Sequence, residues 1–374
     1  MEHNPRVLII ENSKAYTGAF KSIFAFSEYL NDRFEFFYCL PSDSKIRTQI
    51  SKNLITIPFL ELRRSFWVTI LYLPYLFLNS IRIHRFCKRQ RISIIHVNDL
   101  YNLCGVVIKF LWPSYKVVYH VRLMRGSYVR FFYDVWLRLT LNYADQVICV
   151  SNAVKKNIAD SYVKAKVTII YDAIPEHENY PDQIQPPHHE IKLLYLSNYI
   201  SGKGQKYALR SFKIAQDKLH NCLLVFAGGD MGLEKNKKYK MELLDLSTEL
   251  GIRDSVQFTD FVSDSELLIK TSDILLNFSE SESFSMTCLE AMFYGTPVIA
   301  SDSGGPAELI ENEISGLLVP NRNVNSMAEA IVRLSSDAQL RSRLANSAKL
   351  RAKAKFSLKK SAESLAVVYN DLIQ

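Results

Sequence analysis

Two glutamates eight residues apart, Glu282 and Glu290, are the residues of this chain best placed to do chemistry. They lie in the segment 279–309, SESESFSMTCLEAMFYGTPVIASDSGGPAEL. Glu290 is the only charged residue of a helix predicted over 284–294, and a carboxylate inside an apolar helix needs hydrogen-bonding partners. A pair of ribose hydroxyls would meet that need. The alternative is that Glu290 lies on a solvated helix edge and that Glu282 is a solvated loop residue.

The start of the same helix favours an anion. Residues 279–285 are polar and follow a predicted strand, so they form the loop at its carboxyl end. The N–H groups of Phe284, Ser285 and Met286 would point at whatever this loop faces, and that end of a helix attracts phosphate. The segment therefore predicts a site for a ligand that carries ribose and phosphate.

Further candidates follow predicted strands elsewhere in the chain. Lys203 stands in the turn LSNYISGKG, Gly18 opens a helix after the first strand, and His120 ends a strand in YHVR. Each has an ordinary alternative: a solvated lysine, a turn glycine and a hydrogen-bonded core histidine. Ser151 in CVSNAV is typical of a helix N-cap.

Short apolar runs alternate with longer helical patterns along most of the chain. Strands of this kind joined by helices are typical of a parallel sheet covered on both faces. The predicted strands cover residues 7–10, 34–40, 92–97, 117–121, 147–150 and 167–170, and then 193–196, 223–226, 256–258, 274–277, 297–300 and 317–319. The predicted fold class is α/β, with two doubly wound Rossmann-like domains facing a cleft. Ligands of such sheets bind at the carboxyl ends of the strands.

The domain boundary is predicted at residues 175–190, PEHENYPDQIQPPHHE, which hold four prolines and almost no aliphatic side chains. The first domain would then cover 1–174 and the second 191–355. Residues 356–374 are predicted as a helix that crosses back to the first domain.

Several motifs in register resemble those of a known enzyme family. The spacing E-x7-E from Glu282 to Glu290, the GTPVIAS at 295–301 and the GGP at 304–306 are similar to the group 1 glycosyl transferases. These are retaining, nucleotide-sugar-dependent enzymes of the GT-B architecture. The similarity extends over most of 190–372 and more thinly over the first half.

The resemblance implies a role for each residue around the glutamate pair. Glu290 would bind the nucleotide ribose, and Glu282 would contact the transferred sugar. The backbone amides of Phe284, Ser285 and Met286 would face the sugar and the diphosphate. The family usually has glycine at the position of Ser285.

The same resemblance implies roles for the remaining candidates. Lys203 would neutralise the diphosphate, Gly18 would approach it from the first domain, and His120 would lie beside the sugar and the acceptor. Asn198 stands where the family has a second basic residue, an arginine. The family's Asn-Gly near the end of the first domain is Asp-Ala at 172–173, so nothing is carried over there.

The sequence is thus interpreted as a retaining glycosyltransferase of the hexosyltransferase type. It would move a sugar from a nucleotide diphosphate sugar, bound by the second domain, to a glycan or lipid-linked glycan on the first. The family points to cell-envelope polysaccharide synthesis (lipopolysaccharide, capsule or exopolysaccharide). No Asp-x-Asp pair stands at a suitable loop and no His/Cys cluster occurs, so neither metal nor cofactor is expected.

Other classes of protein are alternatives to this interpretation. A nucleotide-sugar epimerase of the same two-domain fold would need acid and base groups and no acceptor. A non-enzymatic protein that binds anionic surfaces is suggested by the net charge of +8. A dehydrogenase would need a G-x-G-x-x-G after its first strand, which is absent, and no nucleic-acid motif occurs.

Basic charge is concentrated in residues 61–138, which hold 13 basic and 3 acidic side chains and all three tryptophans. The 17 uncharged residues between Arg64 and Arg82 reach only the lower limit for a membrane span, which favours a buried or interfacial helix. Aromatic side chains beside cations suit an anionic headgroup layer. The window predicts docking on the inner face of the cell membrane. The alternative is a core helix with solvated arginines.

The cellular location is predicted from two further features. The apolar run within the first ten residues is too short for a signal peptide, and no two of the six cysteines form a C-x-x-C pair. Both features indicate a cytoplasmic protein with reduced core thiols.

Overall fold

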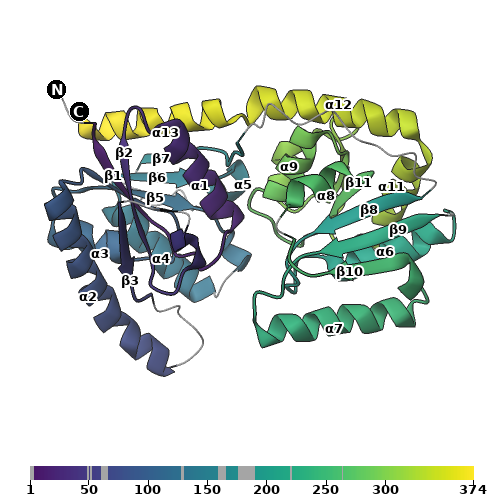
Figure 1. Ribbon diagram of the computed structural model, residues 1–374, viewed down its shortest axis with the longest axis horizontal. Coiled ribbons are helices and arrows are strands. Elements are labelled where there is room, and N and C mark those ends of the chain that lie inside the picture. Colours follow the sequence, from purple (N-terminus) through teal and green to yellow (C-terminus); the bar gives the residue numbers. More distant parts are fainter. Residues whose placement is uncertain are drawn as a thin grey trace. The chain divides into compact units, whose positions relative to one another are not determined.

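A computed structural model describes residues 4–48, 50, 53–59, 66–127, 130–158, 166–175, 190–219, 221–262 and 264–374. The chain divides into two compact units. The first unit contains Met1–Glu176 together with Ser357–Gln374, and the second contains His177–Phe356. Each unit is an α/β layer structure built on its own sheet (Figure 1).

The described strands of the first unit form one parallel sheet of seven, in the order β3-β2-β1-β4-β5-β6-β7. Their residues are mostly aliphatic and buried, as expected for strands covered on both faces. The strands are β1 (Arg6–Ile10), β2 (Glu35–Pro41), β3 (Leu54–Ile57), β4 (Ile94–Val97), β5 (Lys116–Val121), β6 (Gln146–Cys149) and β7 (Lys166–Ile169).

Two helices from opposite ends of the chain cover one face of this sheet. Phe20 and Phe26 of α1 and Leu365 of α13 pack with Ile9 and Val118 of the strands. On the other face α3 contacts β4 and β5 and packs with both α2 and α4. The helices are α1 (Gly18–Tyr29), α2 (Phe66–Gln90), α3 (Cys104–Leu111), α4 (Arg130–Tyr143), α5 (Asn152–Lys155) and α13 (Leu358–Ile373), with short 3-10 turns η1 (Lys45–Thr48) and η2 (Arg125–Ser127).

The second unit has a parallel sheet of six described strands, in the order β10-β9-β8-β11-β12-β13. The strands are β8 (Ile191–Leu196), β9 (Cys222–Ala227), β10 (Val256–Thr259), β11 (Ile274–Asn277), β12 (Val298–Ser301) and β13 (Leu317–Val319). The helices are α6 (Gln205–Gln216), α7 (Glu234–Glu249), α8 (Ser265–Lys270), α9 (Met286–Tyr294), α10 (Gly305–Leu309), α11 (Val324–Ser336) and α12 (Ala338–Lys355), with the 3-10 turn η3 (Arg253–Ser255).

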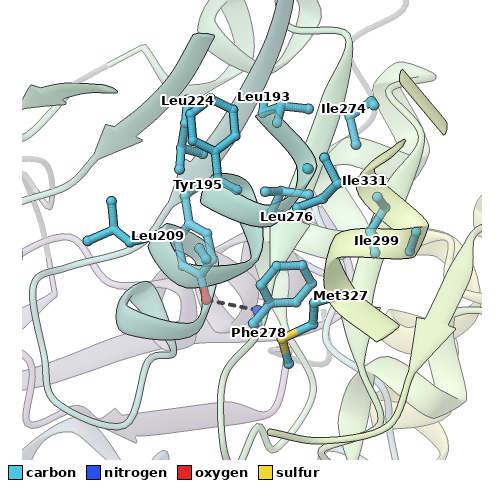
Figure 2. Close-up of a cluster of buried hydrophobic side chains, with 14 of the residues drawn as sticks. Leu193, Tyr195, Leu209, Leu224, Ile274, Leu276, Phe278, Ile299, Met327 and Ile331 are labelled. Carbon is cyan, nitrogen blue, oxygen red and sulfur yellow. Dashed lines mark hydrogen bonds between the residues drawn. The ribbon is translucent and has the colours of Figure 1, made fainter. Parts of the chain in front are cut away.

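The core of the second unit lies between its sheet and the helices α6, α7 and α11. Figure 2 shows Leu209 of α6 and Ile331 of α11 on the same cluster as Leu276 of β11 and Ile299 of β12. Helix α9 contacts β11 and β12 and packs with α8 and α12.

Both sheets reverse their direction of strand addition at one point. In the first unit the switch lies between β1 and β4, and in the second between β8 and β11. The connections that leave two such neighbouring strands diverge, so a crevice opens at their carboxyl ends. The loops after β1, β4, β8 and β11 are therefore positioned to hold ligands.

The predicted fold class is confirmed by the two parallel sheets. Strand β3, a four-residue edge strand of sequence LITI, was not predicted. The interval predicted as a linker, 175–190, falls almost entirely outside the described residues. The six cysteines are buried and unpaired, as predicted.

Candidate active site

Two loops flank the switch point of the second unit, and they bring Lys203 and Glu282 together. Lys203 lies in the loop after β8, and Glu282 lies in the loop after β11. The Lys203 Nζ is 2.8 Å from the Glu282 Oε2. The lysine side chain is 34% exposed and that of the glutamate 14%. This pair places a cation and a carboxylate at the carboxyl ends of two central strands, and sequence analysis predicted both members as site residues.

A buried tyrosine positions the lysine loop. The hydroxyl of Tyr195 accepts a hydrogen bond from the Phe278 amide at 2.8 Å and donates one to the Lys203 carbonyl at 2.5 Å. The bond to Phe278 is the dashed line in Figure 2. Because Tyr195 is part of the core, the lysine backbone is fixed relative to the sheet. Sequence analysis missed this residue, although a tyrosine inside an apolar strand implies a hydrogen-bond partner for its hydroxyl.

Gly204 allows the two loops to touch. A Cβ at this position would lie 1.9 Å from the Phe278 carbonyl oxygen, and the backbone has φ +82°. Both the contact and the left-handed conformation exclude an ordinary side chain. Gly204 thus lets the backbone of the lysine loop pass close to the Phe278 backbone, and this places the Lys203 ammonium group beside the loop that carries Glu282.

The double glycine at 304–305 holds the glutamate loop. The Glu282 amide donates to the Ser303 carbonyl at 3.0 Å, and the Gly305 amide donates to the Glu282 carbonyl at 2.8 Å. A Cβ on Gly305 would lie 2.2 Å from the Phe284 Cα. The two motifs are thus one structural unit, in which the glycines let helix α10 begin directly against the glutamate loop.

Helix α9 begins two residues later than predicted. It starts at Met286, and Ser285 is its N-cap with φ +84°, a left-handed conformation that favours glycine. The Ser285 hydroxyl accepts hydrogen bonds from the Asn277 side chain at 2.8 Å and from the Cys288 amide at 3.4 Å. These contacts hold Ser285 in the left-handed conformation. Phe284 precedes the helix and is buried, so the prediction that it belongs to the helix was wrong.

Glu290 lies in α9 between Leu289 and Ala291, both fully buried, and is itself only 5% exposed. It therefore does not lie on a solvated helix edge. Burial, and then the neighbouring Glu290 carboxylate, raises the pKa of Tyr294.

Asn198, which replaces the expected arginine, has a structural role. Its Oδ1 accepts a hydrogen bond from the Gly229 amide at 3.1 Å, and its carbonyl accepts one from the Gln205 side chain at 2.9 Å. A Cβ on Gly228 would lie 2.0 Å from the Ser197 carbonyl oxygen. Asn198 thereby joins the turn after β8 to the turn after β9 and contributes no charge.

The two arginines that follow His120 in the chain, Arg122 and Arg125, both have carboxylate partners in their own unit. Arg122 forms a buried ion pair with Asp172. Arg125 pairs with Asp134 at 2.6 Å on the surface.

The predicted residues of the first unit lie at the start of a helix or at the end of a strand. Gly18 is the first residue of α1, and Thr17 is its N-cap. His120 is fully buried in β5, with its Nδ1 3.3 Å from the Arg122 Nη2. Burial, the Arg122 charge and His96 hold the pKa of His120 well below its usual range. Ser151 is the N-cap of α5, as predicted.

The structure changes the interpretation of the basic window 61–138. Trp136 and Arg122 are buried, Trp112 stacks on His84 at 3.8 Å, and the side chain of Trp67 lies outside the described residues. Exposed apolar side chains of this window lie on α2, where Leu73 is 67% exposed, and also on α3 and α4, where Phe110 and Phe131 are exposed.

The exposed apolar side chains of α2 are followed by four exposed basic residues. The apolar ones are Leu71, Leu73, Tyr75, Phe77 and Leu78, and the basic ones are Arg82, Arg85, Lys88 and Arg89. None of these four forms a salt bridge within the described part of the chain. We call these nine residues the α2 surface.

Across the residues that the structure places, no helix is both long and apolar enough to cross a bilayer. Among the same residues, no three His, Cys, Asp or Glu side chains are grouped so that they could hold a metal ion.

Comparison with known families agrees with the division of the chain. The family described as "Glycosyl transferases group 1" matches residues 176–351. The family described as "Glycosyltransferase Family 4" matches residues 16–178.

Individual relatives extend the comparison. An uncharacterized glycosyltransferase of Methanocaldococcus jannaschii is 32% identical over 240 residues, which are 60% of this chain and 59% of that protein. The chain thus spans less than two thirds of this curated relative. Among solved structures, Anabaena HepE in complex with UDP-glucose has a TM-score of 0.82 at 19% identity, covering 98% of this chain and 99% of that one. The lipopolysaccharide outer core galactosyltransferase WaaB has a TM-score of 0.70 at 16% identity, covering 96% and 99%.

Proposed function

The chain belongs to the group 1 glycosyl transferases with the GT-B fold, and from this premise we propose that it is a retaining glycosyltransferase. It would move a sugar from a nucleoside diphosphate to a hydroxyl of a glycan or lipid-linked glycan. The observation that carries the proposal is the Lys203–Glu282 pair, 2.8 Å apart at the switch point of the second unit. The UDP-glucose bound by HepE is a donor of the proposed class.

The proposed roles follow from the chemistry of each group. Glu290 is a buried carboxylate suited to paired ribose hydroxyls, and the start of α9 is suited to phosphate. As the bond between the anomeric carbon and the phosphate oxygen breaks, its electron pair stays on that oxygen. Lys203 offsets the developing charge. Glu282 contacts the sugar, and the acceptor hydroxyl gives its proton to the leaving phosphate.

A donor panel tests the reaction class. The full chain is incubated with UDP-, GDP-, ADP- and dTDP-sugars, and both nucleotide release and isomerisation of the sugar are measured. We expect one donor to release its nucleoside diphosphate, faster when a glycan acceptor is present. An isomerised donor without release would identify an epimerase. No turnover of any kind would contradict an enzymatic role.

Removal of divalent metal should leave transfer unchanged within about twofold, because Lys203 and the amides of α9 supply the positive charge that a metal ion would otherwise provide. The measurement is kcat with the active donor in excess chelator. Complete loss of turnover, restored by added Mg²⁺, would contradict the metal-free mechanism.

Lys203→Ala should lower kcat by about 100-fold or more, the usual effect of losing one group that stabilises a developing oxyanion. Glu282→Ala should also depress kcat, but it should leave the affinity for free nucleoside diphosphate nearly unchanged. Calorimetry with the nucleoside diphosphate separates the two variants. Lys206→Ala is the control, because Lys206 pairs with Glu242 on the nearby helix surface. Equal activity of the Lys203 and Lys206 variants would contradict the assignment.

We also propose that the α2 surface docks on an anionic membrane face and that the acceptor is lipid-linked. Four cations without salt-bridge partners in the described chain follow a run of half-exposed apolar side chains on one helix. Rings and aliphatic chains can enter the headgroup layer, and each cation contributes about 1 kcal/mol near such a surface. A role in cell-envelope polysaccharide synthesis would follow, and WaaB, which has the same fold, is named as a galactosyltransferase of the lipopolysaccharide outer core.

The full chain should sediment with vesicles of equal phosphatidylglycerol and phosphatidylcholine at low salt, and it should be released at high salt because screening weakens the attraction. Arg85→Glu/Arg89→Glu should abolish binding. Lys235→Glu/Lys238→Glu makes the same charge change on exposed positions of α7 and should not affect it. A wild-type protein that stays in the supernatant at low salt would contradict docking and favour a soluble acceptor.

A further inference from the structure

A row of buried polar side chains crosses the carboxyl edge of the first unit's sheet. On the face covered by α1 and α13, strand residues alternate, so every second residue points the same way. Two residues beyond Ile9 this face presents Glu11, and two residues beyond His120 it presents Arg122. Asn98 and Asp172 follow β4 and β7 in the same manner. All of these polar side chains are buried.

The row is joined by hydrogen bonds that meet at one guanidinium group. The Arg122 Nε donates to the Asn98 Oδ1 at 2.9 Å, and its Nη1 forms the ion pair with Asp172. The Asn98 amide in turn donates to a carboxylate oxygen of Glu11. The remaining Arg122 nitrogen, Nη2, lies 3.3 Å from the Nδ1 of His120. Asn98 and Asp172 therefore hold Arg122 on two sides, and its Nη2 is directed at the histidine ring.

This contact determines which ring nitrogen carries the proton. A guanidinium group has only donors, so the His120 Nδ1 must accept. A neutral imidazole that accepts at Nδ1 has its proton at Nε2. The neighbouring charge and the burial of the ring both disfavour a second proton. The His120 Nε2 is buried and has no hydrogen-bond partner among the described residues.

We propose that Arg122 is a positioning residue that holds His120 as the Nε2–H tautomer, so that His120 donates a hydrogen bond to an oxygen of a bound sugar substrate and does not act as a base. The substrate class rests on the proposed function, whereas the tautomer rests on geometry alone. A buried donor without an acceptor is rare in folded proteins, and a sugar hydroxyl or ring oxygen would satisfy it.

A second buried histidine packs beside this one. The rings of His96 and His120 lie 5.5 Å apart, and the His96 Nδ1 is 2.6 Å from the hydroxyl of Tyr369 on α13. Burial and Arg122 lower the pKa of His96 to about 3. Among the described groups, those that act on the pKa of His120 are His96, which is neutral, and Arg122, which is ion-paired.

Long-range proton–nitrogen NMR of the full chain with ¹⁵N-labelled histidine reads the tautomer without substrate. His120 is identified by the signal that disappears in His120→Gln. We expect a protonated Nε2 and a bare Nδ1 at pH 7. A proton on Nδ1, or on both nitrogens, would overturn the inference. Because no substrate is present, a failure of sugar transfer would count against the proposed function and leave this result standing.

A double variant tests the role of the arginine. Arg122→Met/Asp172→Leu removes both charges together, so that neither is left buried and unpaired. We expect the His120 signal to show a mixture of tautomers and kcat to fall on the order of 10-fold, with the Kd for UDP unchanged.

The control is Arg33→Met/Glu363→Leu, which removes a bidentate pair of the same unit at 2.8 and 2.9 Å. It should change neither the tautomer nor kcat. A double variant at 122 and 172 that keeps both the wild-type tautomer and the wild-type kcat would overturn the positioning role. If this variant does not fold, the wild-type tautomer still decides the proposal.

Discussion

Replacing Glu290 by alanine should weaken the binding of nucleoside diphosphate by about 100-fold. The side chain is 5% exposed in an apolar helix, and we assign its carboxylate to the two ribose hydroxyls. Hydrogen bonds to a charged group contribute about 1.5–3 kcal/mol each, so the loss of two can account for this change. Calorimetric titration of the full chain with the nucleoside diphosphate of the active donor measures the effect.

Two comparisons make this result specific. Glu329→Ala removes an exposed carboxylate from α11 in the same unit and should leave the affinity unchanged. Thermal unfolding of Glu290→Ala without ligand separates a binding role from a structural one. If the variant binds nucleoside diphosphate as tightly as the wild type, the ribose assignment is wrong. If it loses stability and affinity together, the carboxylate supports the fold of α9.

Gly204→Ala should abolish measurable transfer, a fall in kcat/KM of about 1,000-fold, and should also lower the free energy of unfolding. The new Cβ would lie 1.9 Å from the carbonyl oxygen and 2.3 Å from the carbonyl carbon of Phe278. Because these are backbone atoms of a central loop, no side-chain rotation can relieve the overlap. The loop that carries Lys203 must move away from Glu282.

Gly202→Ala is the matched control for Gly204→Ala. Gly202 has a similar backbone conformation, φ +92°, but a Cβ there would meet nothing within 4 Å. It therefore reports only the strain of the left-handed conformation, about 1–2 kcal/mol. Urea unfolding and kcat/KM of the two variants are compared. Equal effects would show that the close approach to Phe278 has no importance of its own.

The parts of the fold that could be predicted are those encoded by local pattern. Buried central strands such as β4 and β12 are short apolar runs, and the helices between them have the expected periodicity. Strand β3 carries the same signal, since its residues LITI are a short apolar run, and it was nevertheless not predicted. The start of α9 at Met286 was not predicted, because Ser285 has a left-handed conformation that ends the helical pattern. That conformation is held by a hydrogen bond from Asn277, a residue outside the helix.

The site was predictable where its residues share one motif, and not where it depends on tertiary contact. Glu282 and Glu290 lie within one strand–loop–helix segment. Arg122 and Asp172 are 50 residues apart, and only the alignment of β5, β6 and β7 brings them together. A simple signal was nevertheless present, since a charged residue two positions beyond a buried histidine on an alternating strand must share its face. The contact from Tyr195 to Lys203 likewise required the strand and its loop to be placed together.

The first unit is discontinuous in the chain, because α13 belongs to it although the whole second unit is inserted before that helix. During translation the ribosome therefore releases Met1–Glu176 long before the segment that completes its core. In the folded unit Tyr369 of α13 packs against Phe34, with the ring centroids 5.3 Å apart, and forms a hydrogen bond with His96. Until α13 is made, neither Phe34 nor His96 is covered by it. The inserted unit is continuous and can fold as it emerges, whereas the nascent first unit must wait with apolar surface exposed, in the condition that recruits chaperones.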